Sequence, residues 1–413
     1  MKIDNLRTEN YENRTRVAAT MIWEDRDRPS QDIYFETTKE FATDICCDPN
    51  AFLTICAIPA MRYGERRIAI DAPVCPELKD GLTTVMNYLV HWYGGTRRII
   101  PIEAPLQSEL VSSAPEPRAG CFFSGGIDAS AMVRANRLNF PLEHPRSIKD
   151  GILIYGILEW EDDRTEHSFK HLINGVSAIA NDANINLIPI YTNAYVLIRD
   201  LDPDFQFWKL EFQGSFLAAV AHTLSRRLTA VSIASTYDLA HLDPWGSHPL
   251  IDHHFSSNTL RIHHEDAALS RLAKTKLVAQ WDVVLKHLHV CNVKESYHSD
   301  NYNCGKCEKC VRTMTALLAL GLLEQTPAFK EKDVSKELLL KAAYLTDSYE
   351  ESCYRELIEP LAQIGRYDLV DGINAIITRY HEQDLKGLMK RFDRAFFGGN
   401  LFNLSKKLIV SSK

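Results

Sequence analysis

The stretch "CFFSGGIDAS", residues 121 to 130, ends an apolar run in Ser124, Gly125 and Gly126 and places Asp128 where a helix is expected to begin. Successive glycines let backbone N–H groups converge on an anion, and the N-terminus of the following helix adds the positive end of its dipole. The other interpretation is a plain tight turn with a helix cap at Ser124 or Asp128. Neither the G-x-x-x-x-G-K-[ST] string nor the G-x-G-x-x-G fingerprint is present here. The pattern predicts a strand, an anion-binding turn and a helix.

Apolar segments typical of strands alternate with helical segments over residues 116 to 320. This alternation predicts a doubly wound α/β domain, a parallel sheet with helices on both faces. Ligands of such sheets bind at the carboxyl ends of the strands. The stretches expected at that edge are 124–128, Glu159 and 235–238. The strands are expected at 119–123, 151–157, 185–192 and 228–236, and the helices at 128–138, 165–181 and 210–226.

The parts of the chain on either side of this domain follow other patterns. Residues 1–115 are predicted to form an accessory α+β domain, with strands at 16–23, 51–58 and 66–72 and one helix over 75–94. A segment rich in Pro, Ser, Ala and Glu at 104–120 predicts a linker and a boundary near residue 115. Residues 321–413 are predicted to form a C-terminal helical region.

Composition and charge narrow the class of protein. Of the 413 residues, 45% are hydrophobic and 24% are charged, which is typical of soluble globular proteins. No apolar run approaches the roughly 20 residues of a membrane helix, and the N-terminus has no signal-like apolar core. A net charge of -7 argues against general nucleic-acid binding. We therefore expect a cytoplasmic protein whose partners include neither a membrane nor nucleic acids in general.

Four of the ten cysteines lie close together in the sequence: Cys291, Cys304, Cys307 and Cys310. Two overlapping C-x-x-C units and an upstream cysteine supply the four thiolates of a closed tetrahedral zinc site. Such a site is structural, because it leaves no open position for catalysis. The alternatives are reduced core cysteines or a redox pair. The other six cysteines are interpreted as ordinary thiols, since the cytosol disfavours disulfides.

The string "SGGIDAS" resembles the Ser-Gly-Gly-x-Asp-Ser loop of the PP-loop ATP pyrophosphatases, enzymes that cleave ATP to AMP and pyrophosphate. The resemblance implies that Asp128 helps to bind Mg²⁺ and that four residues hold phosphate oxygens: Ser124, Gly125, Gly126 and Ser130. Ala129 stands where the family usually has serine, and Ser130 is the hydroxyl next to it.

Together with the cysteines, residues 118 to 320 resemble the 7-cyano-7-deazaguanine synthases. The zinc motif of that family has one upstream cysteine and then C-G-x-C-x-x-C-x-x-R, and the matching string here is "CGKCEKCVR". The spacing from Cys291 to Cys304 is longer than expected for that family. The resemblance implies an ATP-dependent, AMP-forming ligase that adenylates a carboxylate, 7-carboxy-7-deazaguanine, and couples it to ammonia. Relatives with extra regions occur in bacterial defence islands, where a protein amine is an alternative acceptor. Structural Zn²⁺, Mg²⁺ and the co-substrate ATP are the implied cofactors.

A polar segment over residues 235–281 is expected to line the site. A lysine on a helix that begins near Ser270 is expected to face the pyrophosphate as its counter-ion, Lys274 before Lys276. Arg271 is the third expected catalytic residue beside Asp128 and Lys274; Asp238 and Asp252 are further candidates. Adjacent histidines on an extended segment point to opposite faces, which favours ordinary hydrogen bonding over a second metal site. The histidines concerned are His241, His248 and the adjacent pairs His253 with His254 and His263 with His264.

Two other functions stay open from the sequence. One is another PP-loop amidotransferase or tRNA-modifying enzyme. The other is a catalytically reduced binding subunit of a multiprotein defence complex, which the alanine at position 129 favours.

Overall fold

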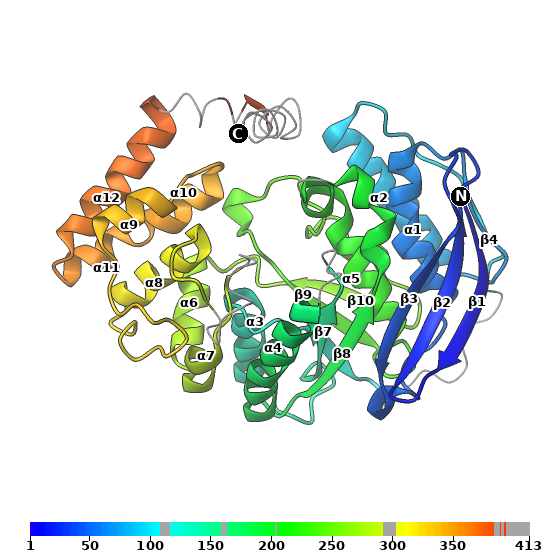
Figure 1. Cartoon of the computed structure of the whole chain (residues 1–413), viewed down its shortest axis with the longest axis horizontal. Coiled ribbons are helices and arrows are strands. Elements are labelled where there is room, and N and C mark those ends of the chain that lie inside the picture. Colours follow the sequence, from blue (N-terminus) through cyan, green and yellow to red (C-terminus); the bar gives the residue numbers. More distant parts are fainter. Residues whose placement is uncertain are drawn as a thin grey trace.

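The computed structural model describes residues 1–107, 116–157, 163–202, 205–291 and 303–383, with residues 389, 392 and 393. Within them, ten strands form one mixed sheet in the order β10-β9-β6-β7-β8-β3-β2-β1-β4-β5, and helices pack around it (Figure 1). The chain is therefore an α/β protein.

Five neighbouring strands of this sheet are parallel: β6 (Ala119–Phe122), β7 (Ile148–Tyr155), β8 (Asn186–Thr192), β9 (Ala230–Ala234) and β10 (Arg261–Glu265). Counted along the chain, their spatial order is third, second, first, fourth, fifth, which is a Rossmann-like order. The order reverses between β6 and β9, and the carboxyl ends of these two strands mark the switch point where such sheets bind ligands. The edge strand β10 was missing from the sequence prediction.

Helices cover both faces of the parallel strands, as predicted. Along β7, Ile152 belongs to the core shared with α5 (Gln213–His222), whereas Leu153 belongs to the core shared with α3 (Ile127–Asn139) and α4 (Asp163–Asp182). The α3 and α4 core also includes side chains of α6 (Arg271–Ala279), α7 (Asp282–His287) and α8 (Glu308–Ala319). It extends into the C-terminal helices α9 (Lys336–Ala342), α10 (Ser348–Arg355), α11 (Ile358–Gln363) and α12 (Tyr367–Thr378).

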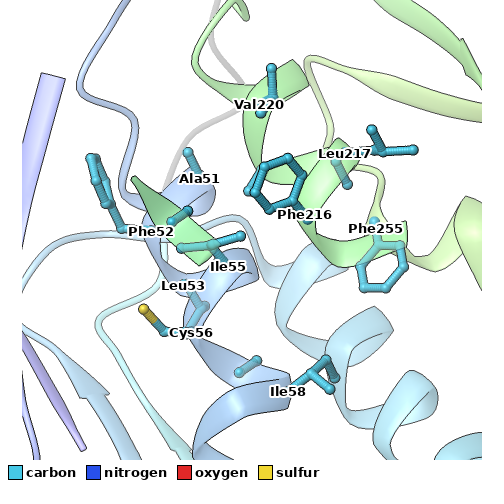
Figure 2. Packing of buried hydrophobic residues seen from close by; sticks show 14 of the residues in the cluster. Ala51, Phe52, Leu53, Ile55, Cys56, Ile58, Phe216, Leu217, Val220 and Phe255 are labelled. Carbon is cyan, nitrogen blue, oxygen red and sulfur yellow. The ribbon is translucent and has the colours of Figure 1, made fainter. Parts of the chain in front are cut away.

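The N-terminal segment adds the other half of the sheet. It forms β1 (Lys2–Asn10), β2 (Arg14–Ile22), β3 (Gln31–Thr38), β4 (Ile68–Ile70) and β5 (Ile102–Glu103), with helices α1 (Pro49–Tyr63) and α2 (Pro76–Tyr93). Strand β3 pairs antiparallel with β8, with Phe35 opposite Thr192. Figure 2 shows Phe52 and Ile55 of α1 in the same apolar cluster as Phe216 of α5. Sheet and core thus run continuously from the N-terminal segment into the parallel strands.

The strand predicted at residues 51–58 was wrong, because these residues lie in α1. Every residue of α1 except Pro49 and Arg62 is buried. A helix buried on all sides has a continuous apolar sequence, which shows no 3.6-residue period and is read as a buried strand. The end signals of a helix were present: the Asp48 side chain accepts a hydrogen bond from Asn50 N, proline follows at position 49, and Gly64 ends the helix at φ +76°.

Some expectations fall outside the described residues. They include Glu159, the linker residues 108–115 and nearly all of the chain after residue 383. The domain boundaries near residues 115 and 320 stay predictions. Among the described residues, no helix has the length and apolar composition needed to cross a membrane.

Candidate functional site

The turn between β6 and α3 lies at the carboxyl edge of the parallel strands. Gly125 adopts φ +72°, a left-handed conformation that favours glycine, and a Cβ there would lie 3.1 Å from Val176 Cγ2. A Cβ on Gly126 would lie 3.4 Å from the backbone oxygen of His289. Ser124 is exposed to solvent. Both glycines are therefore packed closely, and the turn leads directly into the N-terminus of α3.

Asp128, in the first turn of α3, faces two cations of α6. Nη1 of Arg271 donates to the two carboxylate oxygens of Asp128 at 2.8 and 2.9 Å. Nζ of Lys274 lies 3.7 Å from Asp128 Oδ1 and donates to the carbonyl oxygen of Ser235 at 2.6 Å. Ser235 follows β9, so these contacts join both sides of the switch point. The structure thus brings together the three residues predicted to be catalytic.

Burial and neighbouring charges shift the pKa values of Asp128 and Lys274 in opposite directions. Burial raises the pKa of Asp128, but the positive charges of Arg271 and Lys274 outweigh it and hold this pKa below its ordinary value. Burial lowers the pKa of Lys274 by more than the Asp128 carboxylate raises it. Only 1% of the Lys274 side chain is exposed. The Asp128 carboxylate is accordingly ionised at neutral pH and held among cations.

Two further cations, Lys309 and Arg312 of α8, escaped the sequence prediction. The charge of Arg312 acts on Asp128, and 7% of Arg312 is exposed. Surrounding protein atoms and the charges of Arg312 and Arg271 lower the pKa of Lys309, whose side chain is nevertheless open to solvent. The nearest carboxylate to Arg312 is that of Glu308, at 3.4 Å. The signal in the sequence was their position among the clustered cysteines, in "CEKCVR".

The hydroxyl of Ser130 is in a different environment from that of Ser124. Ser130 is 0% exposed, and its Oγ has no hydrogen-bond partner among the described residues. Ala129 is also buried. Of the two serines expected to hold phosphate oxygens, only Ser124 is open to solvent in this structure.

The four clustered cysteines bring their sulfur atoms within 4.8 Å of one another. Sγ of Cys291 lies 3.8 Å from Sγ of Cys307, and Sγ of Cys304 lies 3.9 Å from Sγ of Cys310. Ligands about 2.3 Å from a tetrahedral zinc ion lie about 3.8 Å from one another, so the arrangement fits such an ion. The turn is made by Gly305 at φ +68°. The cluster could therefore hold a metal ion such as zinc. None of the ten cysteines, all of which lie among the described residues, forms a disulfide.

The remaining candidates lie elsewhere along the polar segment. Asp238 caps a short helix (Leu239–His241) and accepts from Nδ1 of His241 at 2.7 Å. Asp252 is 0% exposed and bonds to Nδ1 of His264 at 2.8 Å. No hydrogen bond or ion pair links either aspartate to Asp128 in the part of the chain that the structure describes. Lys276 is exposed on α6. Of the other histidines, His248 is buried, His254 is half-buried, and His253 and His263 are exposed.

The arrangement combines a Ser-Gly-Gly turn, the carboxylates of Asp128 and Glu308, and four cationic side chains near a topological switch point. Backbone amides at a helix N-terminus with lysine and arginine beside them suit a phosphate-containing ligand. A carboxylate oxygen is the kind of ligand that Mg²⁺ prefers. Comparisons with protein-family models, with curated proteins and with solved structures gave no match to this chain.

Proposed function

We propose that this chain is an ATP-dependent, AMP-forming carboxylate–amine ligase of the PP-loop kind. Its proposed substrate is a deazaguanine-type carboxylate, 7-carboxy-7-deazaguanine, and its amine is ammonia or an amine of a protein. The observation that carries the proposal is the contact of Asp128 with Arg271 and Lys274, directly after the Ser-Gly-Gly turn at the switch point. Sheet order, turn and charges all support a nucleotide at this edge.

In the proposed reaction, a carboxylate oxygen of the substrate attacks the α-phosphorus of ATP, and the bond to pyrophosphate breaks. The amine then attacks the acyl carbon, AMP leaves with the carboxylate oxygen, and the amine loses a proton. The backbone amides after β6 and the Lys274 ammonium stabilise the charge of the departing pyrophosphate. Asp128 is the residue that would hold Mg²⁺, which neutralises phosphate charge when bound.

In this proposal, the cysteine cluster stabilises the structure near the start of α8. Cys307 precedes the first residue of α8 and Cys310 lies in its first turn. A zinc ion held by the four thiolates would fix the start of α8, and with it the direction of Lys309 and Arg312. The ion supplies stability there and takes no part in the chemistry.

Nucleotide chromatography tests the proposal. The protein is incubated with ATP, Mg²⁺, 7-carboxy-7-deazaguanine and ammonia, and AMP, ADP and pyrophosphate are quantified. We expect AMP and pyrophosphate to form only when the carboxylate is present, and Asp128→Ala to lower the rate about a hundredfold or more. Asp371→Ala, at a carboxylate that is 71% exposed, is the matched control. Formation of ADP, or equal rates for the two variants, would contradict the proposal.

A catalytically reduced binding subunit is the second candidate function. It is favoured by Ala129 in place of the family's serine and by the enclosed hydroxyl of Ser130. The same assay separates the two functions when ATP binding is measured beside it. Tight binding of ATP without any AMP would favour the binding subunit.

A further inference from the structure

Arg312 is a buried arginine, and two of the nitrogen atoms of its guanidinium lack a hydrogen-bond partner among the described residues. It is 7% exposed, and its Nε and Nη1 atoms, both shielded from solvent, have no hydrogen-bond partner among the described residues. It forms an ion pair with Glu308 on the same helix, at 3.4 Å. Buried charges in folded proteins are ordinarily both paired and hydrogen-bonded. The donors of this guanidinium are therefore satisfied only when another group, such as a ligand, accepts hydrogen bonds from them.

A second unsatisfied group comes from α10. Tyr349 is 4% exposed, and its hydroxyl, beside the Cys353 thiol, makes no hydrogen bond of acceptable geometry with the described residues. The charges of Arg271 and Arg312 both act on this phenol. Burial raises its pKa well above the ordinary value, so the hydroxyl stays protonated and can donate.

Hydrogen bonds join the α10 segment to α6 and to α8, the two helices that carry the cations. The Ser270 hydroxyl, at the start of α6, donates to Oε2 of Glu356 directly after α10. The Tyr354 hydroxyl donates to Oε1 of Glu308 in α8 at 3.3 Å. Tyr349 also packs edge to face against Tyr237, which follows β9, with ring centroids 4.6 Å apart. Helix α10 therefore contacts the starts of α6 and α8 and the segment that follows β9.

The charges around Arg312 indicate the class of ligand. Arg271 is neutralised by the Asp128 carboxylate, to which it bonds twice. Among the described residues, the carboxylates that act on Lys274, Lys309 and Arg312 are those of Glu308, Asp128 and, at Lys274, Asp266. A single carboxylate ligand offers one negative charge and two acceptor oxygens, whereas a chain of phosphates offers these cations several negative charges and many acceptor oxygens.

We propose that Arg312 of α8 and the Tyr349 hydroxyl of α10 bind the phosphate chain of ATP and the pyrophosphate released from it. This inference rests on the proposed function and adds to it that the C-terminal helices form part of the nucleotide site. A phosphate oxygen placed between the two groups accepts a charge-assisted hydrogen bond from the guanidinium and a neutral one from the phenol.

Titration calorimetry with ATP and with inorganic pyrophosphate, each with Mg²⁺, tests this inference on the full chain. We expect Arg312→Met to weaken pyrophosphate binding about tenfold to a hundredfold and Tyr349→Phe about threefold to tenfold. The matched controls are Arg355→Met, at an arginine whose side chain is 55% exposed on α10, and Tyr367→Phe, at a tyrosine that is 64% exposed. Both controls are expected to bind like the wild type.

Thermal melting of the ligand-free proteins distinguishes a binding role of Arg312 from a structural one. Because Nε and Nη1 of Arg312 have no hydrogen-bond partner in the part of the chain that the structure describes, we expect Arg312→Met to melt no lower than the wild type. A lower melting temperature assigns Arg312 a structural role and overturns its assignment to the site. Tyr349→Phe removes one oxygen and keeps the ring, so it tests α10 in either case.

The outcomes separate the two proposals. If the wild type binds neither ATP nor pyrophosphate, the proposed function and this inference both fall. If the wild type binds both ligands and Arg312→Met and Tyr349→Phe bind them equally well, this inference alone is overturned. Weak binding by Arg312→Met with unchanged binding by Tyr349→Phe removes α10 from the site.

Discussion

Lys274 and Lys276 show that two similar residues in the same turn of a helix can lie on different faces of it. They lie two positions apart on α6, and residues at that spacing do not share a helix face. Lys274 is 1% exposed and reaches Ser235 and Asp128, whereas Lys276 points to solvent. The preference for Lys274 over Lys276 was made from the sequence, and the geometry agrees with it.

This difference predicts that Lys274→Met lowers the rate of AMP formation about a hundredfold or more, because the leaving pyrophosphate loses its buried counter-ion. Lys276→Met carries the same chemical change on the same helix and is expected to leave the rate within about twofold of the wild type. Both rates come from the nucleotide chromatography described above. Equal effects of the two substitutions would show that Lys274 does not contact the phosphates.

At the scale of elements, the start of α8 joins the cysteine cluster to the cations Lys309 and Arg312. It begins at Glu308 with Cys307 as its N-cap, and Cys310 and Arg312 follow within the first turns. Backbone N–H groups of Lys306 and Cys307 donate to Cys304 Sγ at 3.4 and 3.3 Å. The sulfur cluster therefore shapes the entry of α8.

Removal of a bound metal is expected to loosen the start of α8 and weaken both stability and pyrophosphate binding. We expect Cys304→Ser, or treatment with a strong chelator, to lower the melting temperature by about 5 °C or more. Elemental analysis should give one zinc per chain for the wild type and for Cys47→Ser, a control thiol outside the cluster. Metal-free wild-type protein with an unchanged melting temperature would exclude a structural metal site.

At the scale of the whole molecule, the sheet links segments that are far apart in the sequence. Strand β3 pairs with β8, and α1 packs against α5 in one apolar cluster (Figure 2). The C-terminal helices lie at the opposite end of the molecule from β1, β2 and β3 (Figure 1). The N-terminal segment thus completes the core of the parallel strands from one side.

This continuity predicts that a fragment of residues 116–413 does not fold by itself. Without residues 1–115 it exposes the edge of β8 and the apolar face of α5 around Phe216, and exposed strand edges and apolar faces cause aggregation. Size-exclusion chromatography and urea unfolding would show aggregates or a non-cooperative transition. Co-expression with residues 1–115 is expected to restore a monodisperse complex. A monomeric fragment with a sharp transition would instead support an independent domain boundary near residue 115.

The sequence by itself determined the elements whose signals are local. The run into Ser124, the two glycines and Asp128 fixed the end of β6 and the start of α3, because turn chemistry depends on adjacent residues. Ser270 marked the start of α6 by capping it, and the cysteine spacing located the cluster that could hold a metal ion. The alternation of strands and helices was sufficient for the α/β class.

Only the tertiary structure decided the features that depend on distant partners. The helix at Pro49–Tyr63 has a strand-like sequence because α5 and the sheet bury it on all sides. Strand β3 pairs with β8, a strand far from it in the sequence, so this pairing is not visible in either local sequence. Arg312 and Tyr349 meet Arg271 only after α6, α8 and α10 have packed together. Local propensity cannot encode such contacts, because they are stabilised by burial and charge shared between segments that have no sequence proximity.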